Sequence, residues 1–533
     1  MNRHEMLRRL DERAATDQPW DMVVIGGGAT GIGIAVDAAS RGHDVVLLEQ
    51  SDFGKGTSSR STKLIHGGVR YLKQGNVPLV MEALKERGIL RENAPHLVTD
   101  LPFVVPNYKW WEAPFYGVGM RVYDVLAGKY GFGHSKNLSV EETVERLPTI
   151  ETDGLRGGVV YHDGQFDDAR LLIHLAMTAA EQGAALVNYA RVVGLLKDEN
   201  GFVCGVTAHD EESGEAMTVA GRVVVNATGA FTDEVRVMDD PSAKPIIQPS
   251  QGVHIVLERS FLPGDSAIMV PETDDGRVLF AIPWESVVLV GTTDTPIEHV
   301  DLEPKPFEEE VEFLIDHAAR YLTRDPSPAD VKSVFVGIRP LVAEAEAEPG
   351  ETAEISREHA IRVSESGLLT IAGGKWTTYR KMAEDVVDFA QTLGDLDLEP
   401  CHTKDLQIHG YHQHTERFGR LALYGADAVE IEDLQAKRPE LAEPLHERLG
   451  LTGAEVVFAC REEMARTVDD ILARRSRGLI YDAQAAIEAA PAVAKLMTAE
   501  LQKDDAWTRA QVEEFEEIAR VYVWPPPPER PAP

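Results

Sequence analysis

The chain has 533 residues, of which 43% are hydrophobic, so it can bury a large core and form more than one domain. Its 53 basic residues against 88 acidic ones give a net charge of −35, which argues against broad binding to nucleic acid or to anionic lipid. The three cysteines, Cys204, Cys401 and Cys460, are far apart, which indicates a reducing compartment and no disulfide framework.

The first 20 residues predict a charged helix that ends near Pro19. They contain no apolar segment of the kind that a secretory signal needs. No run of about 18 apolar residues occurs in the chain, so the sequence predicts no membrane-spanning helix. Peripheral attachment to a membrane stays open.

Residues 21–49 predict one βαβ unit. DMVVIGG predicts a buried strand, GATGIGIAVDAASRG a helix that ends at Gly42, and HDVVLLEQ a second, parallel strand. Residues 26–31 fit G-x-G-x-x-G, directly after a strand and at the start of a helix, which is the context that this motif requires. The unit therefore predicts a dinucleotide-binding site.

Each glycine of this motif has its own role. Gly26 permits the tight turn, Gly28 lets the backbone approach a pyrophosphate, and Gly31 lets helix and strand pack closely. The helix N-terminus offers free N–H groups to the phosphates. Glu49 ends the second strand, where a carboxylate accepts hydrogen bonds from ribose hydroxyls and repels a 2′-phosphate, so NADP is disfavoured.

The next segment, residues 53–70, is rich in Gly and Ser and predicts an ordered loop. Its Ser58, Ser59 and Thr62 could hydrogen-bond a flavin or a pyrophosphate, with ordinary loop capping as the alternative.

Residue periodicity predicts the elements that follow. Strands are expected over 186–225 and 246–296, and helices over 78–96, 108–130, 168–182 and 307–322. The helix over 108–130 is aromatic and amphipathic and is expected to pack on the core, with a membrane-facing surface as the alternative.

Two later segments favour FAD over NAD. Residues 223–229 predict a buried strand that ends in a turn of small residues, where backbone can lie close to a cofactor. Residues 367–392 run from a strand through a Gly373–Gly374 turn to a helix, whose N-terminus could face the flavin edge that becomes negative on reduction. That FAD uses three such segments is a property of known flavoproteins and does not follow from the spacing.

Three further segments have distinctive compositions: an acidic run, a long helical stretch and a proline-rich end. The acidic run 343–351 predicts a solvated loop. Residues 415–520 have helical periodicity with charged faces and predict a separate helical domain, and the proline-rich end predicts a polyproline-like or disordered tail.

The string GTSSRSTKLIHGGVRYL at residues 56–72 resembles the FAD-dependent, quinone-linked glycerol-3-phosphate dehydrogenases. The resemblance continues in VGIRPL at 336–341, in SREH at 356–359 and in LTIAGGKWTTYR at 369–380, and it covers residues 20–525. The related glycerol-3-phosphate oxidases share most of these strings.

This resemblance implies an α/β fold with an FAD-binding Rossmann-like domain of the glutathione-reductase type, an interleaved antiparallel β-sheet substrate domain and a C-terminal α-helical domain. The FAD-dependent region is expected over 18–395, the helical domain over 396–525 and the Pro-rich tail over 526–533. Cofactor-binding parts are expected at about 18–90, 186–240 and 330–395, and substrate-domain parts at about 91–185 and 241–329.

The resemblance also implies the site residues. Arg339 and Arg357 are expected to grip a phosphate, because the planar fork of arginine matches phosphate oxygens. Arg70, Tyr71 and Lys375 are expected to position the substrate under the flavin. The expected cofactor contacts are Gly26, Gly28, Gly31, Glu49, Ser58, Ser59, Thr62, Gly229, Gly373, Gly374 and Lys375.

Oxidation of a secondary alcohol needs a base for the hydroxyl proton while hydride leaves carbon for the flavin N5. His66 and His254 are the two candidates, and Arg70 is the alternative, as a group that stabilises the alkoxide. No cluster with metal spacing and no G-x-S-x-G motif occurs, so neither a metal nor serine-hydrolase chemistry is expected.

The implied reaction is oxidation of sn-glycerol 3-phosphate to dihydroxyacetone phosphate, with the reduced FAD reoxidised by a membrane quinone. Three alternatives stay open. The first is an oxidase that passes electrons to oxygen and makes hydrogen peroxide. The second is a related flavin oxidase of an amino acid, and the third is a non-catalytic FAD-binding interaction subunit.

Quinone use implies a cytoplasmic protein that attaches peripherally to the inner face of the cell membrane. At a net charge of −35 this contact must be hydrophobic or locally basic. Residues 110–130, with Lys109, Arg121 and Lys129, are the candidate segment. No nucleic-acid partner is expected, and whether the protein forms a homodimer stays open.

Overall fold

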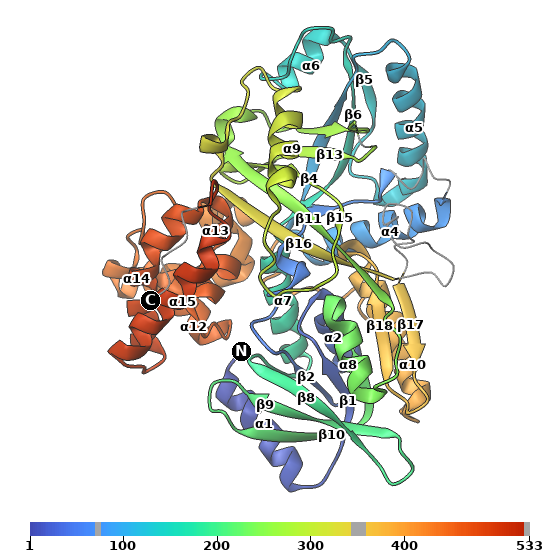
Figure 1. Cartoon of the computed structure of the whole chain (residues 1–533), viewed down its shortest axis with the longest axis vertical. Coiled ribbons are helices and arrows are strands. Elements are labelled where there is room, and N and C mark those ends of the chain that lie inside the picture. The colour runs from blue at the N-terminus through green and yellow to red at the C-terminus, as the bar shows by residue number, and fades with distance from the viewer. Residues whose placement is uncertain (70–75, 275, 343–358, 527–533) are drawn as a thin grey trace.

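The protein is described by a computed structural model that covers residues 1–69, 76–274, 276–342 and 359–526 (Figure 1). Three of the predicted site residues, Arg70, Tyr71 and Arg357, lie outside the described residues, as do the acidic run and nearly all of the tail. Among the helices that are described, none has the length and apolarity that crossing a membrane requires.

The first sheet carries the predicted βαβ unit and has eight strands within the described residues. Its parallel centre runs in the order β10-β1-β2-β7, with bounds Ala216–Asn226, Trp20–Ile25, Val45–Leu48 and Ala185–Val187. At the outer edge of β10 lie β18 (Leu369–Gly373), which is parallel, and β17 (His359–Val363), which is antiparallel to β18. β9 (Val203–Asp210) pairs with β10 in antiparallel orientation, and β8 (Ala190–Lys197) pairs with β9 in the same way.

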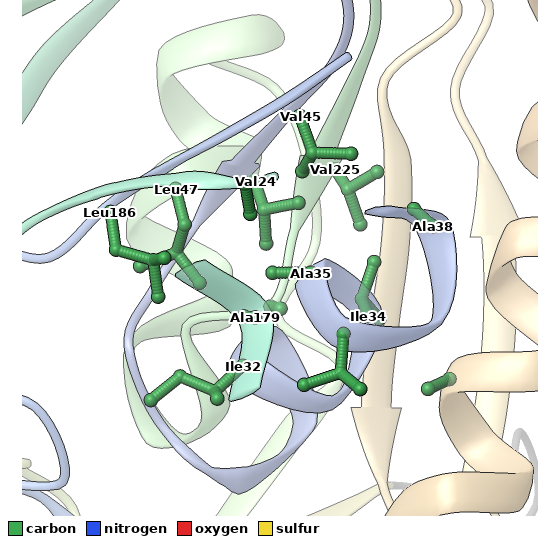
Figure 2. Packing of buried hydrophobic residues seen from close by; sticks show 14 of the residues in the cluster. Val24, Ile32, Ile34, Ala35, Ala38, Val45, Leu47, Ala179, Leu186 and Val225 are labelled. Atoms are coloured by element: carbon green, nitrogen blue, oxygen red, sulfur yellow. The ribbon is translucent and has the colours of Figure 1, made fainter. Parts of the chain in front are cut away.

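Helices cover this sheet and explain why its strands are apolar on both faces. α2 (Ala29–Ser40) follows β1 and packs against α7 (Asp168–Glu181) and α10 (Tyr379–Leu393). Figure 2 shows Val24, Leu47 and Val225 of three strands gathered around Ile32 and Ala35 of α2, all of them fully buried. α1 (Arg3–Ala15) and α8 (Thr232–Asp239) complete this half of the molecule. The predicted N-terminal helix and βαβ unit are confirmed.

The second sheet has ten strands within the described part of the chain and is mostly antiparallel. Its order is β15-β11-β14-β13-β12-β4-β6-β3, with β16 paired to β11 and β5 to β6. The bounds are β3 Leu64–Ile65, β4 Val98–Pro106, β5 Lys136–Leu138, β6 Gly158–Phe166, β11 Ile247–Glu258, β12 Ala267–Val270, β13 Leu279–Trp284, β14 Val287–Gly291, β15 Thr295–Pro296 and β16 Ser333–Val342.

One strand of this sheet lies where the sequence did not lead us to expect it. β16 falls within residues 330–395, which were expected to bind the cofactor, yet it pairs with β11 from Ile247↔Val342 to Val256↔Ser333. This long register joins β16 to the second sheet, so Arg339 reaches the site from the substrate side. The strands β4 and β6 were not predicted either, because neither shows a clear alternation of apolar and polar residues.

The predicted helices are confirmed to within a few residues. α4 spans Val77–Asn93, α5 spans Glu112–Ala127, and α9 spans Glu308–Ala319, while the short α6 (Val140–Arg146) was not predicted. α5 lies along the side of the second sheet, far from the C-terminal helices (Figure 1).

The C-terminal region is helical, as predicted, with bounds α11 Ala428–Lys437, α12 Gly453–Glu462, α13 Gly478–Tyr481, α14 Ala483–Glu500 and α15 Asp505–Arg520. A short π-helix at Asp470–Arg475 precedes α13. The core of these helices is continuous with that of the second sheet. Val468, Ile471 and Phe515 belong to the same buried cluster as Trp284 and Phe335 of β13 and β16.

Candidate functional site

A first cavity opens at the carboxyl ends of β1, β10 and β18, and three turns line it. Gly26, Gly28 and Thr30 come from the turn between β1 and α2, residues 228–231 follow β10, and residues 373–376 follow β18. The carboxyl ends of parallel strands are where ligands bind in open α/β sheets. The three segments that the sequence singled out therefore line one cavity, with Gly229, Gly373 and Gly374 among the lining residues.

The first turn is shaped by close backbone contacts. Gly26 has a φ of +109°, and a Cβ there would lie 2.7 Å from the carbonyl oxygen of Ala227. A Cβ at Gly31 would overlap the carbonyl oxygen of Gly26, so α2 can lie this close to the turn only without a side chain. Gly31 therefore sets the packing of helix on strand and is not itself part of the cavity wall, whereas Gly28 is.

Glu49 lines the same cavity and holds the glycine turn in place. One carboxylate oxygen accepts a hydrogen bond from the backbone N–H of Gly27 at 2.6 Å, and the other accepts one from Ser51 at 2.8 Å. Burial raises the pKa of Glu49 above its usual value. Each carboxylate oxygen has a second lone pair, so acceptor capacity remains for a hydroxyl group in the cavity.

The Gly/Ser-rich segment was predicted to be a loop over 53–70, but β3 begins at Leu64. The loop of residues 51–63, which precedes β3, contributes to this cavity from the other side. The hydroxyl of Ser58 accepts a hydrogen bond from the N–H of Ala29 at 2.9 Å, at the start of α2. Ser59 is only 4% exposed and lines neither cavity, because its carbonyl oxygen is turned toward Lys63 and Arg477. Of the three loop residues expected at the cofactor, Ser58 thus lines the first cavity and Thr62 a second one.

The second cavity adjoins the first and shares part of its wall. Thr57, Pro340 and residues 373–376 line both. Its other walls come from the loop and from the paired strands β11 and β16. A molecule in this cavity would therefore lie directly beside a cofactor held by the three turns.

A pair of glycines forms the floor of the second cavity. Gly252 of β11 lies opposite Gly337 of β16, between the pair His254↔Phe335 and the pair Ser250↔Arg339. Directly opposed residues of an antiparallel pair point to the same face, so His254 and Arg339 project from one face with the two glycines between them. Without side chains at these two positions, the guanidinium of Arg339 can lie over Gly252 and the backbone carbonyl of Arg60 can lie over Gly337.

The guanidinium of Arg339 lies so close to Gly252 that a side chain on residue 252 would collide with it. A Cβ at Gly252 would come within 2.6 Å of both terminal nitrogens of Arg339. The guanidinium of Arg339 lies 3.3 Å from Asp294 Oδ1 and donates to the hydroxyl of Thr292 at 3.2 Å. The side chain is 20% exposed, so this cation is held by the sheet and still open to the cavity.

His254 lies at the other end of the floor. Its ring stacks on Phe335 with centroids 4.6 Å apart, and its Nε2 lies 3.0 Å from the hydroxyl of Thr62. Burial, together with the positive charges of Lys63 and Arg339, holds the pKa of His254 well below its usual value. The imidazole is therefore neutral at pH 7, and one of its two ring nitrogens carries no proton.

Three further polar residues complete the second cavity. His66 and Lys375 line it, as the sequence led us to expect, and Lys375 lines the first cavity as well. Arg60, which was not predicted, lines it too and is paired with Glu303 at 2.6 Å. The signal for Arg60 was its place inside the specific string at 56–72. The cavity thus combines cations from three segments with two histidines, which suits a small substrate that carries an anionic group and a proton to be removed.

No group of side chains that could hold a metal ion occurs in the part of the chain that the structure describes.

Comparison with known proteins identifies two matching families. The family described as FAD dependent oxidoreductase matches residues 21–380, and the one described as C-terminal domain of alpha-glycerophosphate oxidase matches residues 369–508. The mitochondrial glycerol-3-phosphate dehydrogenase of Mus musculus is 42% identical over 539 residues, which cover 95% of this chain and 73% of the relative. The corresponding protein of Schizosaccharomyces pombe is 38% identical over 95% of this chain and 87% of its own.

A solved structure is similar over almost the whole chain. The glycerol-3-phosphate dehydrogenase from Bacillus halodurans, complexed with FAD, matches with a TM-score of 0.79 at 29% sequence identity. The match covers 98% of this chain and 97% of that one. The likeness therefore extends through the C-terminal helices as well as both sheets.

Proposed function

The chain belongs to the FAD-dependent glycerol-3-phosphate dehydrogenases, and from this we propose that its two adjoining cavities hold FAD and sn-glycerol 3-phosphate side by side. The enzyme oxidises the secondary alcohol of this substrate and releases dihydroxyacetone phosphate. FAD, when bound, supplies the acceptor for the hydride that leaves C2.

The residues of the first cavity fit FAD. The N–H groups of the first turn of α2 that follow Ala29 suit the pyrophosphate, since that of Ala29 donates to Ser58, and Gly28 leaves room for the approach. Glu49 retains acceptor capacity for the ribose hydroxyls. The turns that contain Gly229 and Gly373 expose backbone to the same cavity, which supports a placement of the ring system between them and the loop.

The substrate phosphate is proposed to bind Arg339, with Lys375 and Arg60 adding positive charge around it. Arg357, which the family resemblance assigns to the same phosphate, and Arg70 and Tyr71, which it assigns to the substrate, lie outside the described residues and stay predictions. The fixed position of Arg339 above Gly252 supports its part in this assignment, because a preformed cation loses little freedom on binding.

His254 is proposed as the base that takes the hydroxyl proton. It is neutral at pH 7, because burial and then the charges of Lys63 and Arg339 lower its pKa. The negative charge of a bound phosphate would oppose the effect of these two charges and raise the pKa toward its usual value. Thr62, at 3.0 Å from Nε2, orients the ring. His66 is the second candidate, because it lines the same cavity.

The floor of the second cavity is the observation that carries this proposal. A fixed cation, Arg339, lies over Gly252, and the neutral His254 projects from the same face of β11 and β16, beside the cavity of the three glycine turns. A phosphorylated alcohol needs this arrangement, with its anion at one end and its hydroxyl at the other.

Anaerobic addition of glycerol 3-phosphate to the purified FAD-bound protein tests the proposal. We expect the flavin absorbance near the visible maximum to bleach with glycerol 3-phosphate but not with glycerol or glycine. Bleaching by glycine would favour the amino-acid oxidase alternative. A flavin that stays oxidised with all three compounds would favour the non-catalytic alternative and overturn the proposal.

The electron acceptor is proposed to be a membrane quinone, and α5 is proposed to be the part that docks on the membrane. Its exposed apolar residues, Trp111, Phe115, Val118, Val122 and Val125, recur at intervals of three and four and therefore form one stripe. Met120 and Tyr123 of the same helix are buried, so α5 has both a core-facing and an outward apolar face.

Charge supports a lipid surface as the occupant of this outward face. Lys109, Arg121 and Lys129 are exposed at its margins, although the chain as a whole has a net charge of −35. Basic residues beside exposed tryptophans are typical of helices that lie in a membrane interface. On this proposal the protein acts at the inner face of the cell membrane.

Liposome flotation tests the docking, and peroxide yield tests the acceptor. We expect the parent protein to float with anionic vesicles and Val125→Glu to stay at the bottom, while both retain flavin bleaching by substrate. A stoichiometric yield of hydrogen peroxide during turnover with oxygen would favour the oxidase alternative. Equal flotation of parent and variant would remove α5 from the proposal.

A further inference from the structure

The loop of residues 51–63 serves both cavities. Its residues 54–58 line the cofactor cavity, and Thr57, Arg60 and Thr62 line the substrate cavity. Apart from the short 3-10 turn Thr57–Ser59, it has no regular secondary structure before β3 begins at Leu64. Its position must therefore be fixed by contacts from outside, and many of these come from residues 469–477 of the C-terminal helical region.

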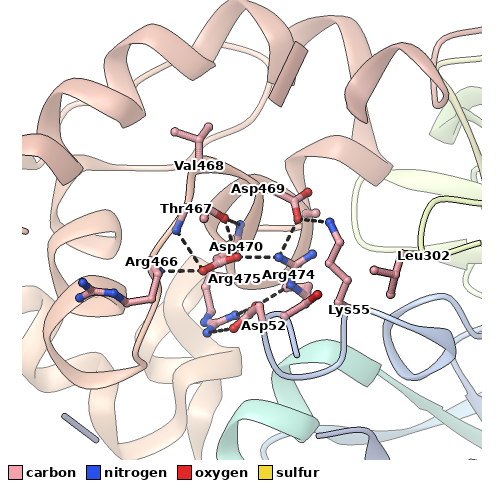
Figure 3. A network of polar contacts seen from close by, with 12 residues as sticks. Asp52, Lys55, Leu302, Arg466, Thr467, Val468, Asp469, Asp470, Arg474 and Arg475 are labelled. Carbon is pink, nitrogen blue, oxygen red and sulfur yellow. Dashed lines mark hydrogen bonds and ion pairs between the residues drawn. The ribbon is translucent and has the colours of Figure 1, made fainter. Parts of the chain in front are cut away.

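The first contact holds the start of the loop. Asp52 is fully buried, and Arg475 donates to both of its carboxylate oxygens, at 2.7 and 3.0 Å. Arg474 donates to one of them at 2.5 Å. Burial alone would raise the pKa of Asp52, but the two guanidiniums hold it below its usual value. Figure 3 shows both arginines directed at this carboxylate from the π-helix.

A second contact holds the loop at Lys55, in the part that lines the cofactor cavity. The ammonium group of Lys55, which lines the first cavity, lies 2.8 Å from Asp469 (Figure 3) and 2.8 Å from Glu303. Asp469 also accepts a hydrogen bond from Arg474 at 2.8 Å. The same C-terminal segment thus contacts the loop at two points.

The third contact holds the end of the loop. Arg477 donates to the carbonyl oxygen of Ser59 at 2.7 Å and to Asp168 at 2.9 Å. Lys63 donates to the same two residues, at 2.9 and 2.7 Å. Arg477 has a φ of +62°, a conformation that persists in a non-glycine residue when its surroundings enforce it.

This third contact reaches the substrate cavity. The N–H and the hydroxyl of Ser61 both donate to Asp168, at 2.9 and 2.7 Å. The next residue is Thr62, whose hydroxyl lies 3.0 Å from Nε2 of His254. Any shift of the segment between Ser59 and Lys63 would therefore move Thr62 relative to the histidine.

We propose that Arg474, Arg475 and Arg477 are positioning residues for the oxidation, through which the C-terminal helical region fixes the loop of both cavities. The inference rests on the proposed function, because it takes the first cavity as the FAD site and His254 as the base. Arg474 and Arg475 hold the part of the loop that walls the cofactor, and Arg477 holds the part that carries Thr62.

Energetics support a positioning role over a purely structural one. Buried ion pairs are expensive to desolvate, and well-packed apolar residues of similar size stabilise a fold as well or better. A contact surface that served cohesion alone would be apolar, as most of this core is. Fixed direction is what bidentate arginine contacts provide and apolar packing does not.

The test compares Arg477→Met and Arg475→Met with Arg466→Met as a matched control. Arg466 also joins the C-terminal region to the rest of the chain, with two contacts of 2.7 Å to Glu212, but it does not touch the loop. The measurements are the rate constant of anaerobic flavin reduction at saturating glycerol 3-phosphate, the dissociation constant of FAD and the melting temperature, with all kinetics well below melting.

Distinct results are expected for the three variants. Arg477→Met should reduce the flavin at least tenfold more slowly, with a shifted pH profile because Thr62 no longer orients His254. Arg475→Met should bind FAD at least tenfold more weakly. Arg466→Met should melt at lower temperature, with rate and FAD affinity within twofold of the parent. Arg477→Lys, which keeps the charge and one donor direction, should recover part of the rate.

The outcomes separate this inference from the proposed function. Should Arg477→Met or Arg475→Met not fold, the lysine substitution at the same position and Asp52→Asn serve instead, and each should change the rate constant or the dissociation constant of FAD by more than twofold. Loop-contact variants that match the parent within twofold in rate, pH profile and FAD affinity would overturn the positioning role. A parent protein that glycerol 3-phosphate does not bleach would instead overturn the proposed function.

Discussion

The two cavities are built in different ways, although they share a wall. The wall of the cofactor cavity includes three turns that each directly follow a strand of the first sheet. The wall of the substrate cavity includes residues of the loop, of β11 and of β16, which are far apart in the sequence. A local string of strand, glycine turn and helix can specify a site of the first kind, whereas a site of the second kind depends on the register of paired strands.

The largest expected effect concerns the base, at the side-chain cavity. His254→Gln removes the proton acceptor and should slow anaerobic flavin reduction by about 10²–10⁴-fold, which is the usual contribution of general-base catalysis. FAD should stay bound, because His254 does not line the cofactor cavity. Stopped-flow absorbance measures the rate, with His66→Gln as the matched variant. A larger loss for His66→Gln would transfer the role to that histidine.

The next effect concerns the phosphate-binding arginine. Arg339→Met removes a charged hydrogen-bonding partner of the substrate, which is worth about 1.5–3 kcal/mol, so kcat/KM for glycerol 3-phosphate should fall by about 10–150-fold. Arg324→Met, at an exposed arginine paired with Asp330, is the control and should leave kcat/KM unchanged. If the two variants behave alike, the anion does not bind at Arg339.

Two glycine substitutions are expected to affect the two cavities differently, one the affinity for FAD and the other the KM for glycerol 3-phosphate. Gly31→Ala places a methyl group against the backbone of Gly26, and overpacking of this kind costs about 1–3 kcal/mol, so FAD should bind more weakly. Gly252→Ala should displace the guanidinium of Arg339 and raise the KM for glycerol 3-phosphate by about tenfold, a penalty of the same order, while FAD affinity is retained. The two cavities do not behave as separate sites if both variants lose FAD to the same extent.

The smallest expected effect concerns a contact that touches neither cavity. Burial opposes its charge, but hydrogen bonds with Asp427 and Glu181 raise the pKa of His409 to about 9. A group whose folded pKa is raised contributes stability that is complete below its unfolded pKa, about 6.5, and is lost as pH rises through about 9. The melting temperature should thus fall more between pH 7 and pH 9.5 for the parent than for His409→Gln.

Flavin reduction at pH 7 should be the same in the parent and in His409→Gln, which makes this variant a control for stability alone. A parallel decline of the two melting curves with pH would contradict the contribution of His409.

The contrast between the cavities also explains what could be predicted from the sequence. The glycine turn, Glu49 and the Gly373–Gly374 turn, which the sequence singled out as cofactor contacts, line one cavity. Both glycine turns could be found because a strand, a glycine string and a helix are consecutive in the chain, and their contact with the cofactor stays a prediction. Arg60 and the glycine pair Gly252 and Gly337 were not selected. Their importance follows from the β11–β16 register, which no local pattern indicates.

The C-terminal region was predicted as helical but not as part of the site. Helical periodicity identified the helices, since it reports which faces are apolar. It could not indicate that Arg474, Arg475 and Arg477 contact a loop that lies some four hundred residues earlier in the chain. Charged residues on a helix are mostly solvated, and only the tertiary structure shows these three to be buried.

The most direct test of the central claim is a crystal structure of the protein with FAD and dihydroxyacetone phosphate. We predict that the phosphate lies within hydrogen-bonding distance of Arg339, and that the carbonyl oxygen lies within reach of His254, above Gly252 and Gly337. A phosphate bound away from Arg339, or a C2 oxygen directed away from His254, would contradict the account.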